Sequence, residues 1–158
     1  MTEQDLGFLR QAIELAAKNV ETGRGGPFGA VVVRKGEVVG TGVNRVTSTP
    51  DPTAHAEVEA IRDACRAMGT FSLAGCTIYS SCEPCPMCLA AIYWARLDRL
   101  VFATGRENAA QAGFDDQFFY EQVALAPEDR TLPYERGLEE EGLAPFRLWA
   151  EKRDRVDY

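Results

Sequence analysis

Two short motifs in the middle of the chain constrain its fold more than any other feature. His55-Ala-Glu57 contains the only histidine, and Pro84-Cys-Pro-Met-Cys88 contains two of the five cysteines. One imidazole and two thiolates form a soft donor set that leaves one tetrahedral position open, as a catalytic zinc ion requires. The fold must therefore bring the two motifs together.

The first motif lies where we expect a helix to begin. Thr53 is predicted as the N-cap of a helix from about Ala54 to Met68, with Gly69 past its end. Side chains two residues apart point to opposite sides of a mature helix, so His55 and Glu57 can face one site only at a helix start. The sequence thus predicts that both lie in a first turn.

The second motif also lies at an expected helix start, because Pro86 suits the first turn of a helix. Unsatisfied backbone N–H groups and the positive end of the helix dipole favour thiolate over thiol at Cys85 and Cys88. Glu57 is then better suited to carry protons than to bind metal, since a fourth protein ligand would close the site to water. H-x-E together with P-C-x-x-C is the signature of zinc deaminases.

One alternative involves Cys82, which with Cys85, Cys88 and His55 would form a closed structural zinc site. That alternative leaves the spacing of Glu57 without a purpose. Cys65 and Cys76 are expected to be core cysteines without chemistry.

The remaining pattern predicts a three-layer α/β/α sandwich on a mixed central sheet, in one domain over residues 1–158. Expected elements are a helix over Leu6–Val20, a hairpin of Ala30–Val33 and Val38–Gly40 that supplies the antiparallel part, and strands at Cys76–Ser80 and Leu100–Ala103. The helix at Ala54–Met68 should bury Ala54, Val58, Ile61, Cys65 and Met68. Beyond Gly105 we expect helices around Phe118–Val123 and Phe146–Trp149, with Glu139–Glu141 as a solvated turn.

Composition narrows the classes of function. Hydrophobic residues are 46% and charged residues 26% of the chain, as in ordinary globular domains. The net charge of −7 disfavours nucleic acid as a partner. We find no long apolar stretch that predicts a membrane span, and an acidic N-terminus with an odd number of cysteines favours a cytoplasmic protein without a disulfide framework.

The chain resembles the cytidine deaminase superfamily and, within it, the bacterial guanine deaminases. The resemblance runs from the first helix to the last residue, through the segments Gly25–Ala30, Asn44, Pro52–Glu57, Ser81–Cys88, Ile92–Arg96 and Ala112–Asp116. The zinc segments are shared with tRNA adenosine deaminases. Trp94, the segment Gly113–Asp116 and the terminal Tyr158 point to guanine.

The resemblance implies one Zn²⁺ per subunit, held by His55, Cys85 and Cys88 with water as fourth ligand. It implies Glu57 as general acid/base, and guanine converted to xanthine and ammonia. The implied substrate contacts are Phe28, Asn44, Asp116, Trp94 and Tyr158. The resemblance also implies a homodimer in which a C-terminal segment of about 140–158 is exchanged, so that Tyr158 enters the partner's pocket.

Structural explanations compete for three of these contacts. Taken without the family, Phe28 is a core residue, Asn44 a turn residue, and Asp116 the N-cap of the helix that follows it.

Two other functions also compete. A tRNA adenosine deaminase would use the same zinc chemistry on a flipped-out base, but it needs a basic surface. Its basic cluster here would be Arg147, Lys152, Arg153 and Arg155, which acidic residues interrupt. A non-catalytic binding module stabilised by zinc is the third possibility.

Overall fold

The computed structural model describes residues 1–158, and its centre is a four-stranded sheet. The strand order is β2-β1-β3-β4, with β1 and β2 antiparallel, β1 and β3 antiparallel, and β3 and β4 parallel. The bounds are β1 Gly29–Arg34, β2 Glu37–Val43, β3 Cys76–Cys82 and β4 Arg99–Thr104. The mixed sheet is therefore confirmed, and its antiparallel part extends beyond the hairpin to the β1–β3 pair.

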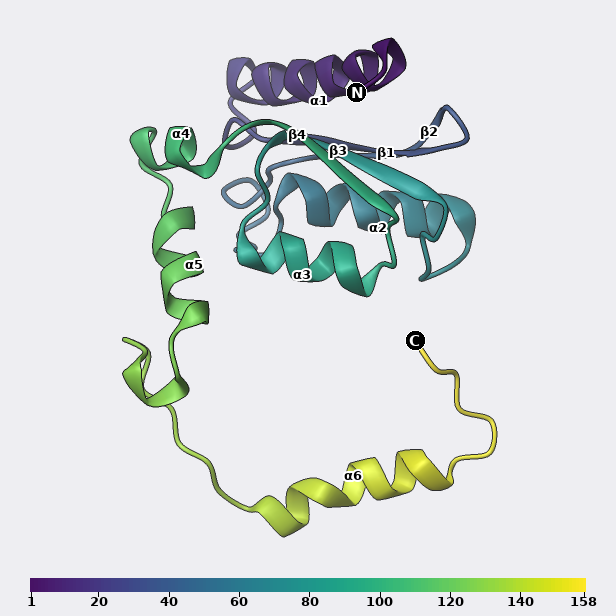
Figure 1. Cartoon of the computed structure of the whole chain (residues 1–158), viewed down its shortest axis with the longest axis vertical. Coiled ribbons are helices and arrows are strands. Elements are labelled where there is room, and N and C mark those ends of the chain that lie inside the picture. Colours follow the sequence, from purple (N-terminus) through teal and green to yellow (C-terminus); the bar gives the residue numbers. More distant parts are fainter.

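Helices cover both faces of this sheet, as Figure 1 shows. One face is covered by α1 (Glu3–Glu21), and the opposite face by α2 (Ala56–Met68) and α3 (Pro86–Trp94). The predicted three-layer α/β/α sandwich is confirmed.

The α1 helix is fixed to the sheet at its N-terminal end by Asp5. Thr2 and Asp5 form a capping box, so the helix start is satisfied locally. The Asp5 carboxylate also accepts hydrogen bonds from Arg99 at 2.7 Å and from the Tyr79 hydroxyl at 2.7 Å. These partners, Arg99 first, hold the pKa of Asp5 well below its usual range.

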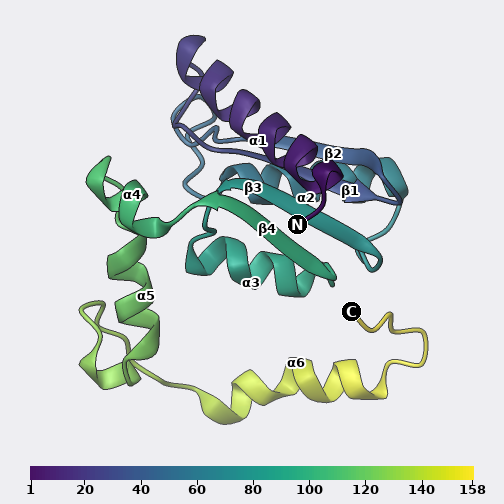
Figure 2. The same ribbon diagram turned by 45° about the horizontal axis from the view of Figure 1, so that its top comes forward.

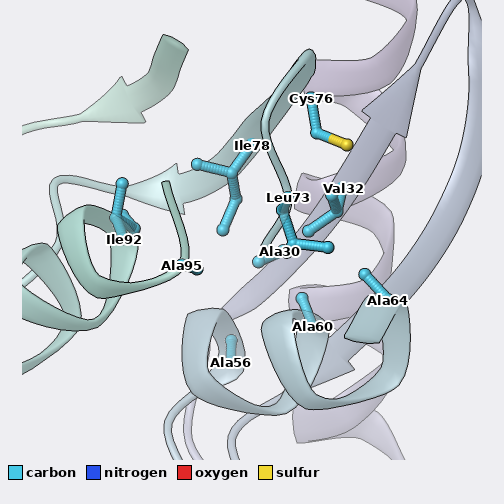
Figure 3. Packing of buried hydrophobic residues seen from close by; sticks show 10 residues of the cluster. All are labelled: Ala30, Val32, Ala56, Ala60, Ala64, Leu73, Cys76, Ile78, Ile92 and Ala95. Carbon is cyan, nitrogen blue, oxygen red and sulfur yellow. The ribbon is translucent and has the colours of Figure 1, made fainter. Parts of the chain in front are cut away.

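The α2 helix approaches β2 more closely than side chains ordinarily allow. A Cβ on Gly42 would lie 2.1 Å from the Ala56 carbonyl oxygen, and one on Gly40 would lie 2.5 Å from the Ala64 backbone nitrogen. The fully buried stripe is Ala56, Ala60 and Ala64, all labelled in Figure 3. Of the expected stripe, Ala54 is buried, and Ile61, Cys65 and Met68 are partly buried and pack against this core, whereas Val58 is only partly buried and does not join it. Small residues face the sheet because two glycines of β2 let the helix backbone come near it.

The start of α2 also differs from expectation. His55 is the N-cap, and the helix begins at Ala56. Thr53, the predicted cap, instead donates its backbone N–H and its hydroxyl to the Asp51 carboxylate at 2.8 and 2.7 Å. Asp51 thus closes a turn that delays the helix by two residues, which still leaves His55 and Glu57 at its start.

The core between the sheet and the α2–α3 layer contains Ala30, Val32, Leu73, Ile78 and Ile92, as seen in Figure 3. Cys76 is buried in this cluster and Cys65 packs partly against it, as expected for core cysteines. All five cysteines are free thiols.

After β4 the chain leaves the sandwich. It forms α4 (Arg106–Gln111), α5 (Asp116–Ala124), a 3-10 turn (Pro127–Asp129) and α6 (Glu139–Glu151). We call residues 1–104 the body and residues 125–158 the arm, whose helix α6 stands apart from the body in Figures 1 and 2. Only the C-terminal end of the arm returns to the body, where Tyr158 packs against Phe71 and Trp94.

In this part of the chain one element was not predicted and one expectation was wrong. The sequence did not predict α4, and Glu139–Glu141 forms the first turn of α6, where acidic side chains suit the helix dipole, and not a loop. None of the helices combines the length and apolar character needed to cross a bilayer.

Candidate active site

Three side chains that could hold a metal ion converge where α2 and α3 begin. His55 is the N-cap of α2, Cys85 is the N-cap of α3, and neither uses its side chain to cap its helix. The ligand atoms of His55, Cys85 and Cys88 all lie within 4.8 Å of one another. The Nδ1 of His55 lies 3.6 Å from the Cys85 Sγ and 3.5 Å from the Cys88 Sγ. The two helix starts thus bring both motifs to one point.

The electrostatics of this group favour a bound cation. Hydrogen bonds from Cys88 and His55 lower the pKa of the Cys85 thiol to about 4, so Cys85 is a thiolate at neutral pH. The pKa of Cys88 is raised because its proton is shared with Cys85 and because it is buried. A soft cation in place of that shared proton would be held by both sulfurs and the imidazole. This N/S donor set fits Zn²⁺ and leaves one position without a protein ligand.

Cys82 does not join the group. It is buried at the end of β3, and its Sγ lies 3.8 Å from the Gly105 carbonyl oxygen. Burial raises the pKa of its thiol to about 11. In this structure, then, Cys82 does not lie with the three side chains that it would have to join in a closed site.

Glu57 lies beside the three ligands at the second position of α2. It is 5% exposed, and the Ser80 hydroxyl of β3 donates a hydrogen bond to its Oε1 at 3.1 Å. Burial raises the pKa of Glu57 above its ordinary value. A carboxyl group with a raised pKa can both accept and return a proton near neutral pH.

A cavity of about 490 Å³ opens beside this group. It is lined by Gly23, Gly25, Gly26, Phe28, Asn44, Val46, Thr47, His55, Glu57, Glu83, Cys85, Phe114 and Asp116. Its size falls within the range of small-molecule sites. The ring of Phe28 meets the ring of Phe114 edge to face at 4.7 Å between centroids, which gives the cavity an aromatic wall.

Asn44 and Asp116 bring polar groups to the same cavity from distant parts of the chain. Asn44 directly follows β2, and Asp116 is the first residue of α5. Both are buried, and burial raises the pKa of Asp116. The N-cap of α5 is Asp115, so the N-cap explanation of Asp116 was wrong.

Trp94 and Tyr158 lie outside this cavity. Their rings pack against each other at 5.8 Å between centroids, where the C-terminal end of the arm meets the end of α3. Together with Phe146 and Trp149 they line a separate hollow of about 390 Å³. Within one chain, then, the structure brings seven of the nine expected site residues together.

Sequence reasoning missed three residues at the site. Ser80 depends on the register of β3, for which the sequence gives no local signal. Glu83 lines the cavity from within the second motif, next to Pro84, and its Oε2 accepts a hydrogen bond from the Arg106 backbone N–H at 3.1 Å. Phe114 lies inside the segment Gly113–Asp116, which therefore held the signal that could have found it.

Comparison with known proteins agrees with this geometry. The cytidine and deoxycytidylate deaminase zinc-binding region matches residues 2–104. Guanine deaminase from Bacillus subtilis (strain 168) is 48% identical over 151 residues, which are 96% of this chain and 97% of the relative. An X-ray structure of guanine deaminase from Bacillus subtilis superposes with a TM-score of 0.93 at 47% identity, again over 96% of this chain and 97% of the other.

Other relatives share less of the chain. The structure of guanine deaminase from Nitrosomonas europaea superposes with a TM-score of 0.66 at 32% identity, over 69% of this chain and 63% of the other. The tRNA-specific adenosine deaminase of Bacillus subtilis is 40% identical over 102 residues, 65% of this chain and 62% of its own. This chain therefore belongs to the cytidine and deoxycytidylate deaminase family of zinc-binding hydrolases, and its full-length similarity places it beside the bacterial guanine deaminases.

Proposed function

We propose that this chain catalyses the zinc-dependent hydrolysis of guanine to xanthine and ammonia. The observation that carries the proposal is the extent of the similarity to the Bacillus subtilis guanine deaminase, which covers 96% of the chain and so includes α5 and most of the arm. The tRNA-specific deaminases of Bacillus subtilis and Aquifex aeolicus match 65% and 61% of the chain. The zinc site alone indicates the family, whereas the similarity over the rest of the chain favours guanine over tRNA as the substrate.

One zinc ion per chain would be held by His55, Cys85 and Cys88, with water as its fourth ligand. Bound there, zinc would act as a Lewis acid that lowers the pKa of water to about 7. The N-termini of α2 and α3 support the thiolates through their dipoles.

Glu57 would move the protons of the reaction. Its carboxylate takes a proton from the attacking water as the water oxygen bonds to C2 of guanine. It returns that proton to the ring nitrogen next to C2 and carries the next proton to the amine, which leaves as ammonia. C2 then becomes a carbonyl carbon. In the overall reaction, guanine and water give xanthine and ammonia. The raised pKa and burial of Glu57 support this role.

Three side chains would hold the base. Guanine carries N–H groups that can donate hydrogen bonds to a carboxylate such as that of Asp116, at an edge where adenine has no such donors. Its oxygen and ring nitrogens accept hydrogen bonds from an amide such as Asn44. Phe28 would pack against the ring. All three line the cavity beside Glu57, which supports the assignment.

We also propose a cytoplasmic homodimer in which residues of about 140–158 cross to the partner. Tyr158 would then cover the partner's cavity, and Trp94 would complete the surface against which the crossed segment packs. Every residue from Val123 onward is exposed in the single chain, which supports a missing partner surface. Five free cysteines suit a reducing compartment.

The test is a panel of free bases and nucleosides scored for ammonia release. Guanine should be the preferred substrate and xanthine its product, identified by absorbance and mass. A preference for cytosine, adenine or a nucleoside over guanine would overturn the substrate. The control is protein stripped of metal by a chelator, which should regain activity on adding Zn²⁺.

A tRNA adenosine deaminase is the competing function, and the arm argues against it. Arg147, Lys152 and Arg155 pair with Glu140, Asp154 and Asp157 at 3.2, 2.6 and 3.1 Å. These pairs neutralise most of the basic cluster that a tRNA backbone would need. A gel shift at moderate salt should show no tight, salt-sensitive binding of tRNA, whereas such binding would favour the competing function.

A further inference from the structure

The α1 helix buries two polar side chains, and only one of them holds the helix to the sheet. Asp5 at the helix start does so through Arg99 and Tyr79. Asn19 in the last turn is 3% exposed and bonds neither a strand nor another helix. Its Nδ2 donates hydrogen bonds to the carbonyl oxygens of Gly26 at 2.9 Å and of Asn44 at 2.8 Å. Both acceptors belong to residues that line the cavity beside Glu57.

The two hydrogen bonds from Asn19 hold the backbone on either side of the Asn44 side chain, which lines the cavity. The Oδ1 of Asn44 accepts hydrogen bonds from the backbone N–H groups of Gly26 and Val46, each at 3.3 Å. Because Oδ1 is engaged by two donors, the NH₂ end of the Asn44 amide is the end left free for a ligand. The segments that Asn19 joins are thus the segments that orient this amide.

The packing around Asn19 leaves little room for adjustment. A Cβ added to Gly25 would lie 2.1 Å from the Asn44 carbonyl oxygen and 3.1 Å from the Asn19 Nδ2. The loop at Gly25 and Gly26 therefore packs closely against the Asn44 backbone. The Asn19 amide, from the side of α1, is hydrogen-bonded to both segments. A change at Asn19 should reach the cavity through backbone that is already in close contact.

The arrangement also costs stability. The Oδ1 of Asn19 is buried and has no hydrogen-bond partner. A buried acceptor without a partner is unfavourable. An apolar side chain would remove that acceptor, but it would also leave the carbonyl oxygens of Gly26 and Asn44 without the Asn19 donor. The contribution of this amide is therefore the pair of hydrogen bonds that its NH₂ group donates to two residues that line the cavity.

We propose that Asn19 is a positioning residue that orients Asn44 toward the base by holding the backbone of Asn44 and Gly26. This inference rests on the proposed function and deepens it. Asn19 does not touch the base. Its effect on the reaction passes through Asn44.

A double-mutant cycle on full-length, zinc-loaded protein tests the proposal. Asn19→Ala should raise the KM for guanine about tenfold with kcat changed less than about threefold, as expected when binding shared by ground state and transition state is lost. In an Asn44→Ala background the same substitution should change kcat/KM less than about twofold, because the group through which it acts is absent. An equal effect in both backgrounds, or an unchanged KM, would overturn the proposal.

Asn19→Leu provides a second variant in case Asn19→Ala does not fold. It nearly preserves the size of the side chain without adding a charge and removes both N–H donors, so it should raise KM in the same way. The matched control is Asp5→Asn on the same helix, which should lower Tm and leave KM unchanged. A rise in KM for Asp5→Asn equal to that for Asn19→Ala would show a general effect of α1 and overturn the proposal.

A measurement without catalysis separates this inference from the proposed function. If the wild-type protein forms no xanthine from guanine, the proposed function fails. The side-chain amide signal of Asn44 in a ¹H–¹⁵N spectrum then still tests the inference. That signal should shift or broaden in Asn19→Ala and stay unchanged in Asp5→Asn. An unchanged Asn44 signal in Asn19→Ala would overturn the proposal.

Discussion

The body and the arm of this chain bury their residues very differently. Of the 33 buried residues, only Ala109 and Asp116 lie after Thr104, and none lies in the arm. The body has two hydrophobic core clusters and the candidate metal-binding group. The arm carries large apolar side chains that face solvent, among them Leu138 and Phe146 at 73% and 72% exposed.

The difference shows that the body buries its apolar side chains within a single chain, whereas the arm does not. A helix keeps apolar side chains in water only at a cost, and contiguous exposed apolar surface marks an interaction site. The body should therefore fold and bind metal alone, whereas the arm should need a partner surface. Substitutions and a truncation in each part can break this division.

Glu57→Gln tests the chemistry of the body. The amide cannot accept a proton, so kcat for guanine should fall about 10³-fold or more, which corresponds to about 4 kcal/mol of transition-state stabilisation. Zinc content, measured by atomic absorption, should not change. Glu59→Gln, two positions along α2, is the control and should retain activity. Full activity in Glu57→Gln would remove the general acid/base from the mechanism.

Removal of the arm by a stop codon after Ala124 tests the division directly. The truncated chain should stay folded and keep its zinc, because no buried residue is lost. Its kcat/KM should fall about 10²-fold if the arm covers a cavity from which water must be excluded. Circular dichroism, metal analysis and the sedimentation velocity of both proteins check this. Unfolding would show that the body is incomplete, and full activity would show that the arm has no part in catalysis.

Asp116→Asn tests the helix that joins the two parts. An amide presents a donor where guanine also has donors, so kcat/KM should fall about tenfold or more through a higher KM. Gln117→Ala, at the exposed neighbouring position, is the control. An unchanged KM would assign Asp116 to the structure of α5 alone.

Cys82→Ser compares two cysteines of the same segment. Cys82 lies outside the metal group, so this variant should keep its zinc and change activity less than about twofold. Cys85→Ser should lose zinc and activity. Loss of zinc from Cys82→Ser would restore the closed-site alternative.

Asp5→Asn tests how the body holds its first helix. The ionised carboxylate has a lowered pKa in the folded state, so its stabilisation is present above the unfolded pKa of about 3.9 and is lost as pH falls toward the folded value. The variant should have a lower Tm than the wild type at pH 7, and the difference should shrink below about pH 4. Thermal scans at several pH values measure it. A constant difference would show that the charge of Asp5 is not responsible.

The sequence by itself predicted the candidate site and the layers of this protein. The spacing of His55, Glu57, Cys85 and Cys88 predicted a metal-binding donor set and an acid/base residue, because each role needs a particular residue type at a helix start, and the structure brings these side chains together. Apolar periodicity predicted the sandwich, because its helices and strands bury one face each. The start of α2 was predicted two residues too early, because the Asp51 turn competes with the cap at Thr53.

Tertiary structure decided the rest. The hydrogen bond between Ser80 and Glu57 depends on how β3 packs against α2. Asn44 and Asp116 line the same cavity only because the fold brings together segments that are far apart in the sequence. The Ala56–Ala64 stripe of α2 was missed because it faces glycines of β2, and a helix pattern read alone does not contain its partner surface. Short-range sequence patterns predict the local secondary structure of a residue and which chemistry its side chain offers. Which residues meet is decided by packing between segments, and that depends on the whole chain.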